Sequence, residues 1–402
     1  MSQSRTVRRL AASIVGLVGA PLAAQSYYDI IDHRNGVHPY ASLFQLEAGA
    51  IGTRATNDDA SIDPNLPSVR GLDDGISWDG RVYYRDEAFS SRRGTMEAYA
   101  GRDGLFAGYQ DGKILGDDTV TRFEFRGRPW QFYRDGFYDR RKFQKSGYFT
   151  GADYEGYIGF GREAQPGLYV ELGPYFRMLD FNASSLTPDQ SGLFTIPKGF
   201  NAYGGRLYIE QSTAQVDRRR GVPRDGYTLS LTGEREWNDS SGAFGADGFT
   251  TELPSAVWRA RGRLDWYIPA ADSVCWEIFA NGGWHDPKDR LQSIEAQRPL
   301  GHMWGDVQLR LRCHLGDSWT LTPFVHGQYS RLRTADGFSS TSDIFLGGGI
   351  ETYIHFSDAI SLHGWYSYLD NDNRPSIRVD RDVHGQHMFY LGMVLRLGSS
   401  RR

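Results

Sequence analysis

Arginine, aspartate and glutamate recur at every second position in several ten-residue stretches of this sequence. In 257–268, Arg259, Arg261 and Arg263 share one parity, while the other parity carries apolar residues such as Trp266. Only five of the 45 basic residues are lysine, so nearly all the basic groups are guanidinium groups. Rows of arginine that face carboxylates can form paired, charge-assisted hydrogen bonds. Such a row either sets the ion selectivity of a pore or closes the pore.

The charged positions that we expect to point inward, toward a polar lumen, all alternate with apolar neighbours. They are Glu124, Arg126, Glu171, Arg177, Arg259, Arg261, Arg263, Asp265, Glu277, Asp306, Arg310, Arg312 and Glu351. The pattern predicts a pore lining of mixed charge. The alternative interpretation is the charged surface of a soluble protein.

The signatures of common exported hydrolases and zinc enzymes are absent from the sequence. It contains no Gly-x-Ser-x-Gly, no His-Glu-x-x-His and no Cys-x-x-Cys. His285 and Asp286, beside Trp284, suggest a hydrolase dyad, but no residue identifies itself as the nucleophilic serine. We therefore predict no enzyme activity, with an outer-membrane hydrolase kept as an alternative that requires a Ser–His pair within hydrogen-bond reach.

A second group of candidate side chains lies between the last two expected strands. His384 and His387 follow a stretch that holds Asp370, Asp372, Asp380 and Asp382. These side chains could form a loop site for a divalent cation. We favour a solvated external loop, and predict no metal site and no cofactor.

The elements that must position these residues are strands, because the apolar and polar residues alternate with a period of two over about ten residues. The sixteen segments with this pattern lie at about 80–87, 94–100, 103–110, 118–126, 129–138, 153–162, 168–179, 203–211, 226–237, 257–268, 274–284, 305–314, 319–330, 344–355, 359–369 and 387–397. The parity places Cys275 and Cys313 on opposite faces, which disfavours a disulfide. A register error of one residue would reverse that conclusion.

The connections between these segments alternate between short and long. Short links are predicted at 127–128, 163–167, 269–273, 315–318 and 356–358. Long polar links fall between them, and 212–225 is the exception, because it is long where a short turn is expected. A transmembrane barrel has short periplasmic turns and long extracellular loops. A soluble sandwich or propeller, the alternative all-β fold, has no reason to alternate in this way.

The N-terminus predicts export. Arg5, Arg8 and Arg9 precede an apolar run from Leu10 to Leu22, and small residues follow. This is the pattern of a secretory signal peptide, assigned here to 1–24, and a twin-arginine signal is the weaker alternative. Removing three positive charges moves the formal net charge from −4 to −7. That balance gives no reason to expect nucleic-acid binding.

The last expected strand has one wholly apolar face. Phe389 and Leu397 belong to that face, whereas Tyr390 and Arg396 lie on the other one. We expect the apolar face to meet lipid and the other face to meet the lumen. The strand is similar to the C-terminal recognition signal of outer-membrane proteins, with Tyr390, Gly392, Leu395 and Leu397 in the signal positions. The usual terminal aromatic residue is missing, and five residues follow Leu397.

Several motifs in about 201–402 are similar to a known family of barrels. They are Asp217-Arg218, Pro223 to Tyr227, Thr228 to Glu234, Leu309 to Leu311, Leu321 to Phe324 and Gly347 to Glu351. In these motifs the chain resembles the bacterial surface-antigen barrel of the outer-membrane assembly-factor superfamily. The resemblance implies a sixteen-stranded barrel.

Two features depart from the translocating members of that superfamily. Those members carry periplasmic POTRA domains before the barrel, and residues 25–79 are too short to hold one convincingly. They also carry an Arg-Gly-aromatic motif in a loop that folds into the lumen, where this chain has Arg298 to His302, reading Arg-Pro-Leu-Gly-His. The resemblance therefore implies a stand-alone barrel, and does not extend to protein insertion or secretion.

Taken together, the sequence predicts an all-β protein of the outer membrane of a Gram-negative-type bacterium. Its fold is a closed antiparallel transmembrane β-barrel of about 16 strands (about 14–18) over 80–402. Residues 25–79 form a periplasmic tail, an extra strand or a plug. The predicted function is a passive pore for ions or small polar solutes, and the alternative is a barrel for assembly or surface display without free conduction. The expected partners are outer-membrane lipid and, during biogenesis, the outer-membrane assembly machinery.

Overall fold

The computed structural model describes thirteen stretches of the chain, and every regular element in them is a strand. The stretches are 40–55, 75–90, 94–101, 104–116, 119–135, 137–138, 148–182, 194–217, 220–246, 250–293, 301–334, 340–369 and 386–400. Within these stretches there is no helix with the length and hydropathy needed to cross a membrane. The predicted signal peptide, 1–24, lies outside the described residues.

Sixteen of the described strands form the wall of a barrel. They are β1 (Tyr40–Ala55), β2 (Gly75–Asp86), β3 (Gly94–Gly101), β4 (Gly104–Asp111), β5 (Val120–Asp135), β7 (Tyr148–Gln165), β8 (Leu168–Asn182), β10 (Phe200–Ser212), β12 (Val222–Asn238), β14 (Ala256–Ala271), β15 (Val274–His285), β17 (Met303–Leu315), β18 (Trp319–Thr334), β19 (Ser340–His355), β20 (Ile360–Leu369) and β21 (Gln386–Ser400). Five short strands accompany them: β6 (Phe137–Tyr138), β9 (Phe194–Thr195), β11 (Gln215–Asp217), β13 (Gly245–Ala246) and β16 (Leu291–Ser293).

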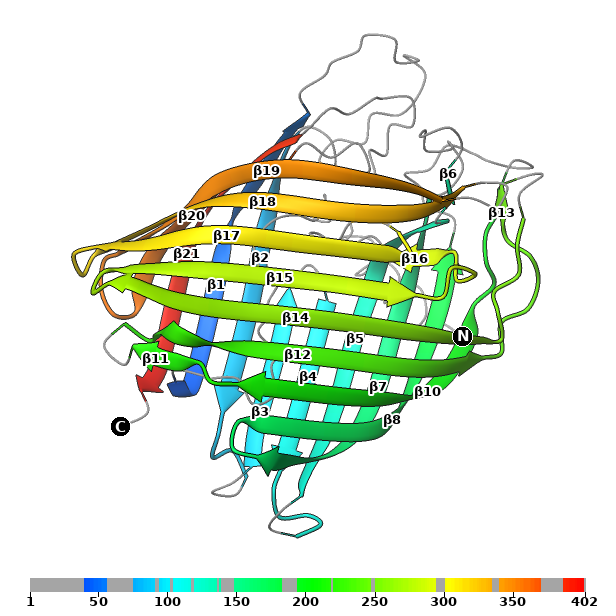
Figure 1. The fold of residues 1–402 in the computed structure, drawn as a ribbon, viewed down its shortest axis with the longest axis horizontal. Helices are drawn as coiled ribbons and strands as arrows, with labels where there is room; N and C mark the ends of the chain where they lie inside the picture. The colour runs from blue at the N-terminus through cyan, green and yellow to red at the C-terminus, as the bar shows by residue number, and fades with distance from the viewer. Residues whose placement is uncertain are drawn as a thin grey trace, which may run out of the picture.

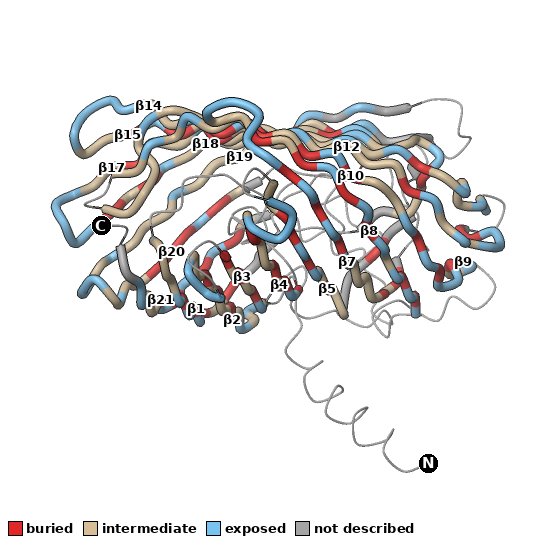
Figure 2. The backbone as a smooth tube through the Cα atoms, turned by 90° about the horizontal axis from the view of Figure 1, so that it is seen from below, coloured by how far each residue is buried: buried red, intermediate tan, exposed pale blue. Residues whose placement is uncertain are grey.

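Each wall strand pairs antiparallel with the next one along the chain, and β21 closes the ring on β1. The closing seam is paired from Tyr40 opposite Ser400 to Ala55 opposite Gln386. In Figure 1, β8 to β19 cross the front of the barrel, while β1 to β7 descend behind them. Figure 2 shows these two walls from below, with buried and exposed residues alternating along the strands. The predicted closed, antiparallel barrel of sixteen strands is confirmed.

The set of sixteen strands differs from the predicted set in two places. The turn predicted at 127–128 is wrong, because β5 runs through it with a register shift between Arg128 and Gln131. Gly127 and Pro129 suggest a turn, but a bulge accommodates the extra residue without ending the strand. Residues 40–55, within the segment left open between tail, strand and plug, form the first strand of the wall, and β2 begins at Gly75.

The outer face of the wall is apolar between two levels of aromatic side chains. Near the ends that lead into the long loops, the exposed residues include Tyr203, Trp237, Trp258 and Trp284. Near the short turns they include Trp266, Trp276 and Trp319. Trp258 and Trp266 are eight residues apart on β14, which corresponds to ~20 Å across a membrane at a strand tilt of ~40°. That spacing fits the apolar band of an outer-membrane barrel with aromatic girdles.

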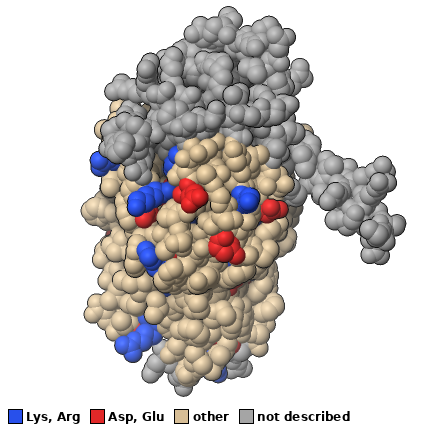
Figure 3. Space-filling model, turned by 90° about the vertical axis from the view of Figure 1, so that its right-hand side faces the viewer, with Lys and Arg blue, Asp and Glu red and all other residues tan. Residues whose placement is uncertain are grey.

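Charged residues are few on the part of the outer surface between these levels. Figure 3 shows one side of the barrel, where only scattered Lys, Arg, Asp and Glu interrupt the described surface. On β21, Phe389, Leu391 and Leu397 are exposed, whereas Tyr390 and Val394 are buried on the inner side. The expected division of the last strand into a lipid face and a lumen face is therefore correct. An apolar belt around a closed barrel places this chain in an outer membrane.

Candidate functional site

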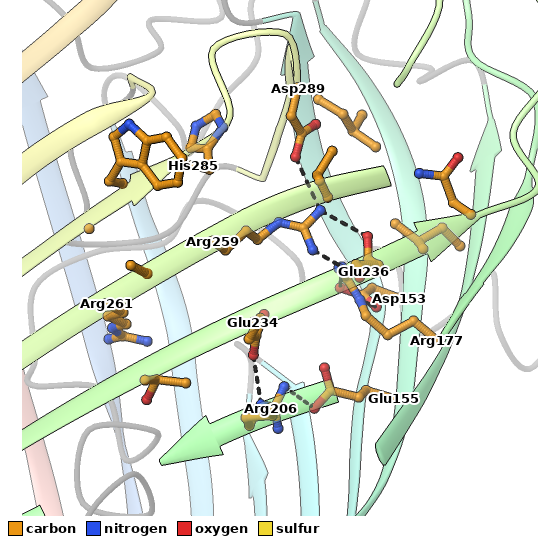
Figure 4. A pocket seen from close by; sticks show the side chains of 18 of the residues that line it. Asp153, Glu155, Arg177, Arg206, Glu234, Glu236, Arg259, Arg261, His285 and Asp289 are labelled. Carbon is orange, nitrogen blue, oxygen red and sulfur yellow. Dashed lines mark hydrogen bonds and ion pairs between the residues drawn. The ribbon is translucent and has the colours of Figure 1, made fainter. Parts of the chain in front are cut away.

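The lumen contains a cavity of about 270 Å³ whose lining is dominated by paired charges. On one side of it a chain of ion pairs links the four strands β7, β8, β12 and β14 (Figure 4). Arg177 on β8 lies 2.8 Å from Asp153 on β7 and 3.0 Å from Glu236 on β12. Arg259 on β14 lies 2.8 Å from the same Glu236. Arg177 and Arg259 thus share the buried carboxylate of Glu236, and these ion pairs hold the strands in register.

The segment after β15 adds a further carboxylate to this chain. Asp289 lies 3.1 Å from Arg259 and is almost fully buried. Two residues later, β16 pairs with the upper end of β5, where Leu291 lies opposite Asp135. Since β5 is the fifth wall strand and β15 the eleventh, this segment reaches across the barrel mouth. A second contact across the mouth joins β6 to the end of β18.

A second cluster lies beside the first and is centred on Arg206 of β10. Its guanidinium group lies 2.6 Å from Glu234 and 2.8 Å from Glu155. The rings of Tyr157 and Tyr175 flank it, each with its centroid 5.0 Å away. Both carboxylates and both rings are inward-facing, so the arginine is held on all sides by wall residues.

A ladder of charges crosses the other half of the barrel. Arg310 on β17 lies 3.2 Å from Glu277 on β15 and also contacts Glu351 on β19. Arg312 lies 2.7 Å from the same Glu277. Glu351 continues the ladder to His363 on β20, at 3.0 Å.

The ladder ends across the closing seam. His363 contacts Glu47 on β1 at 2.7 Å, and Glu47 contacts Arg81 on β2 at 3.3 Å. The two ring nitrogens of His363 thus each face a carboxyl group, Glu47 on one side and Glu351 on the other. The ladder therefore runs from β15 to β2 around the inner wall.

The remaining predicted lining residues also face the lumen. Glu171 is fully buried, and it accepts hydrogen bonds from Tyr157 and Tyr169, both at 2.7 Å. Arg263 makes a two-point contact with Asp265, at 2.9 and 3.0 Å.

The last four predicted positions, Glu124, Arg126, Arg261 and Asp306, also have polar partners on their own strand or on a neighbouring one. Arg261 contacts Asn281 at 3.3 Å, and Asp306 accepts a hydrogen bond from Gln328 at 2.8 Å. Glu124 contacts both Arg122 and Arg126. A role for these residues in lining a conducting pore remains a prediction.

The sequence reasoning missed several members of these clusters. They are Glu47, Arg81, Asp153, Glu155, Arg206, Glu234, Glu236, Asp289 and His363. The alternating Glu234-Arg235-Glu236 of β12 was a usable signal, because it has the period of the predicted rows. Asp289 had no such signal in the sequence, since it lies outside the wall strands and their period-two pattern.

The hydrolase alternative requires a Ser–His pair, and the described residues contain one. Ser361 Oγ lies 2.8 Å from His355 Nδ1 near the short-turn end. The other ring nitrogen faces the Thr320 hydroxyl at 3.5 Å, and no described hydrogen bond ties His355 to a carboxylate. Without an acid to orient the ring, the pair lacks the third member of a triad. The two ring nitrogens of His285 lie 3.2 Å from the backbone carbonyl oxygen of Asp286 and 3.1 Å from that of Gly301.

Two further expectations concern sulfur and metal. Cys275 and Cys313 are free and occupy opposite faces, as predicted. The described residues hold no cluster of three or more His, Cys, Asp or Glu side chains suited to a metal ion. Of the loop candidates, His387 contacts Tyr366 at 2.7 Å, whereas Asp370 to His384 lie outside the described residues.

The residues of the predicted C-terminal signal lie at the seam. Tyr390 and Gly392 face inward and Leu397 faces outward, while the strand continues to Ser400. Tyr390 packs in parallel against Trp365, with ring centroids 6.0 Å apart. The recognition role of this strand stays a prediction.

No protein-family model matches this chain, and no curated protein does. Solved structures do. CdiB from Acinetobacter baumannii aligns with a TM-score of 0.51 and 10% identity, over 94% of this chain and 64% of that one. BamA from Haemophilus ducreyi lacking POTRA domains 1–3 aligns with a TM-score of 0.49 and 9% identity, over 89% of this chain and 71% of that one. CdiB from Escherichia coli aligns with a TM-score of 0.47 and 12% identity, over 90% of this chain and 64% of that one.

These similarities concern the fold. The chain spans 64% of the Acinetobacter CdiB chain, and that alignment covers nearly all of this barrel. The resemblance to the barrel of the outer-membrane assembly-factor superfamily, expected from short motifs, is confirmed at the level of the fold.

Proposed function

We propose that this chain is an outer-membrane barrel that acts in the assembly, export or surface display of other proteins, and that its lumen is closed at rest. This was the alternative to a passive pore in the sequence interpretation. The observation that carries it is the segment after β15, which is held in the lumen by Asp289 on Arg259 and by β16 on β5. A wide passive pore would leave that cross-section open.

The charge balance of the lumen supports the same proposal. The cavity lining holds seven arginines and five carboxylates. Two of those arginines, Arg126 and Arg263, pair with the further carboxylates Glu124 and Asp265. Seven cations and seven anions leave no net charge to select an ion. The pairs are better suited to holding the walls and the inward segment together.

The seam between β1 and β21 bears on how the wall of such a barrel could open. A weak seam between the first and last strands would favour an assembly barrel, but β1 and β21 are paired along their whole length. Any opening of the wall at this seam must therefore break the Glu47–His363 contact and the ladder of hydrogen bonds. A resting state with a closed seam is consistent with a lumen closed at rest.

The second candidate is the passive pore, and the cavity of about 270 Å³ favours it. Single-channel conductance in a planar bilayer separates the two. We expect the wild-type protein, shown to be folded, to conduct rarely, and Asp289→Ala to conduct more often, because Arg259 then loses its contact with the inward segment. Asp272→Ala, which removes an exposed carboxylate at a short turn, is the matched control. Stable, frequent steps in the wild type would establish the pore instead.

A second measurement addresses partners directly. If the proposal is correct, cross-linking in intact cells should join the barrel to periplasmic or exported proteins. These proteins should then co-purify with it. A conducting wild-type protein that carries none of them would leave the passive pore as the function.

A further inference from the structure

The connection between β10 and β12 is long where a short turn was expected, because it forms a hairpin that leaves the barrel wall. β11 pairs with the first residues of β12, and β12 joins β14 in the wall only from Gly226 onward. This connection lies at the end of the barrel with the short turns, which faces the periplasm in outer-membrane barrels. In Figure 1, β11 lies at the left, near the end of β12. We call residues 213–217 and 220–226 the periplasmic hairpin.

Gly226 marks the point at which the chain turns out of the wall. Its φ is 82°, a left-handed conformation that glycine adopts without strain. A Cβ at this position would lie 2.3 Å from the carbonyl oxygen of Thr213, the first residue of the periplasmic hairpin. The backbone thus needs both an unusual conformation and a close approach here, and only glycine allows the two together. The kink separates the hairpin from the rest of β12.

The periplasmic hairpin lies against the inner faces of β15 and β17. Arg312 of β17 donates a hydrogen bond to the carbonyl oxygen of Pro223, and the thiol of Cys275 on β15 lies 3.3 Å from the carbonyl oxygen of Arg224. In the wall, β12 and β17 are three strands apart, which is ~14 Å at the usual strand spacing. These contacts with inward side chains therefore require the hairpin to cross the inner side of β14. The hairpin narrows the lumen at its periplasmic end.

Two arginines fasten the periplasmic hairpin to the turn between β14 and β15. Arg220 donates a hydrogen bond to the carbonyl oxygen of Asp272 at 2.8 Å, and Arg224 donates one to that of Ala271 at 3.4 Å. Arg224 also lies 3.2 Å from the Asp272 carboxylate, but that carboxylate is fully exposed, and exposed ion pairs contribute little. The hydrogen bonds to the turn are exposed as well, so water can replace them when the hairpin moves.

The periplasmic hairpin covers the periplasmic start of the charge ladder. Arg312 lies 2.7 Å from Glu277, and Cys275, which is opposite Arg312 in the strand pairing, is only 3% exposed. The hairpin covers the inner side of three neighbouring strands out of sixteen, so it narrows the entrance without sealing it. A polypeptide that enters the lumen along β15 and β17 must displace the hairpin.

We propose that the periplasmic hairpin is a lid that swings about Gly226 and controls access from the periplasm to the inner faces of β15 and β17. The structure holds the lid closed. Opening breaks the hydrogen bonds of Arg220 and Arg224 with the turn and that of Arg312 with Pro223, whereas the pairing of β10 with β12 in the wall is retained. The inference rests on the proposed function only for what enters, a polypeptide from the periplasm. The movement of the lid is measured without such a partner.

Cys275 is a native reporter of the lid, because its thiol lies under the hairpin. The full-length, folded protein with Cys313→Ser has a single cysteine, and its reaction with the water-soluble reagent sulfonatoethyl methanethiosulfonate is followed by intact-mass spectrometry. We expect slow modification of Cys275 in this protein. Adding Arg220→Ala/Arg224→Ala should make it roughly tenfold faster, because the closed lid loses two hydrogen bonds. Arg162→Ala, which removes an exposed arginine at the periplasmic end of β7, is the matched control and should leave the rate unchanged.

A second variant decides the question if the double substitution disturbs folding. In it, residues 214–225 are replaced by Asn-Gly, which joins Thr213 to Gly226 by a short hairpin turn. Cys275 in this variant should react at least about tenfold faster than in the protein that keeps the hairpin. An unchanged rate would show that the hairpin does not cover the thiol. If the double arginine variant reacts no faster than its parent, or if the parent does not react while the shortened protein reacts completely, the hairpin is a fixed part of the barrel and the proposed lid is wrong.

Discussion

Oε1 of Glu47 and Nδ1 of His363 lie 2.7 Å apart, and this contact joins β1 to β20 across the intervening β21. The two residues are 316 positions apart in the chain. The ring also contacts Glu351 on β19, so one side chain ties three strands around the closing seam. The barrel is thus closed by a side-chain clasp in addition to its backbone pairing.

Replacing the clasp should weaken the barrel. We expect His363→Ala to lower the free energy of unfolding by roughly 2–4 kcal/mol, because Glu47 and Glu351 each lose a hydrogen-bond partner. Unfolding in urea, followed by the shift between folded and unfolded bands on a gel, measures this. His387→Ala, on the outer face, is the control and should change stability little. Equal stability of both variants would show that the backbone seam alone holds the ring.

The glycine at the centre of the seam should not tolerate a side chain. A Cβ on Gly392 would lie 2.1 Å from the Tyr390 hydroxyl and 2.9 Å from the Ala48 carbonyl oxygen. Gly392→Val should therefore sharply reduce the fraction of protein that refolds, because the Tyr390 ring must leave its place. Gly233→Val is the matched control, since nothing lies within 4 Å of the added Cβ. Normal refolding of Gly392→Val would show that the ring can move freely.

The two cysteines should differ in reactivity and should not pair. Cys275 is 3% exposed on the inner face, whereas Cys313 is partly exposed on the outer face. In detergent, we expect a maleimide to modify Cys313 well before Cys275, with peptide mass spectrometry to locate the label. After unfolding, both should react at similar rates. A product of the oxidised protein that links the two cysteine peptides would contradict the strand register.

Arg310 should not be replaceable by lysine. Its guanidinium group lies between the rings of Phe279 and Phe324, at 5.4 and 5.5 Å, while it bridges Glu277 and Glu351. Lysine keeps the charge but loses the planar fork and the stacking. We expect Arg310→Lys to cost roughly 2 kcal/mol of unfolding free energy, with tryptophan fluorescence in urea as the readout. Arg235→Lys on the outer face is the control, and equal losses would mean that the bridge contributes nothing special.

Much of the barrel could be predicted from the sequence. The period of two assigns side chains to faces, and this gave the lipid and lumen sides of β21 and the inward position of Arg259 and Arg310. The alternation of short and long connections gave the antiparallel ring. Errors arose where local signals were weak or misleading. β1 contains small residues such as Ala48 and Gly49, so it alternates poorly, and Pro129 made a bulge look like a turn.

The tertiary structure alone decided which charges meet. A row of arginines on one strand can be recognised in the sequence. The partners of these side chains cannot, because the contact of Arg259 with the segment after β15 and the contact of His363 with β1 depend on the strand registers summed around the whole ring. Alternation is a local property of a strand, whereas register and closure are properties of all sixteen strands together.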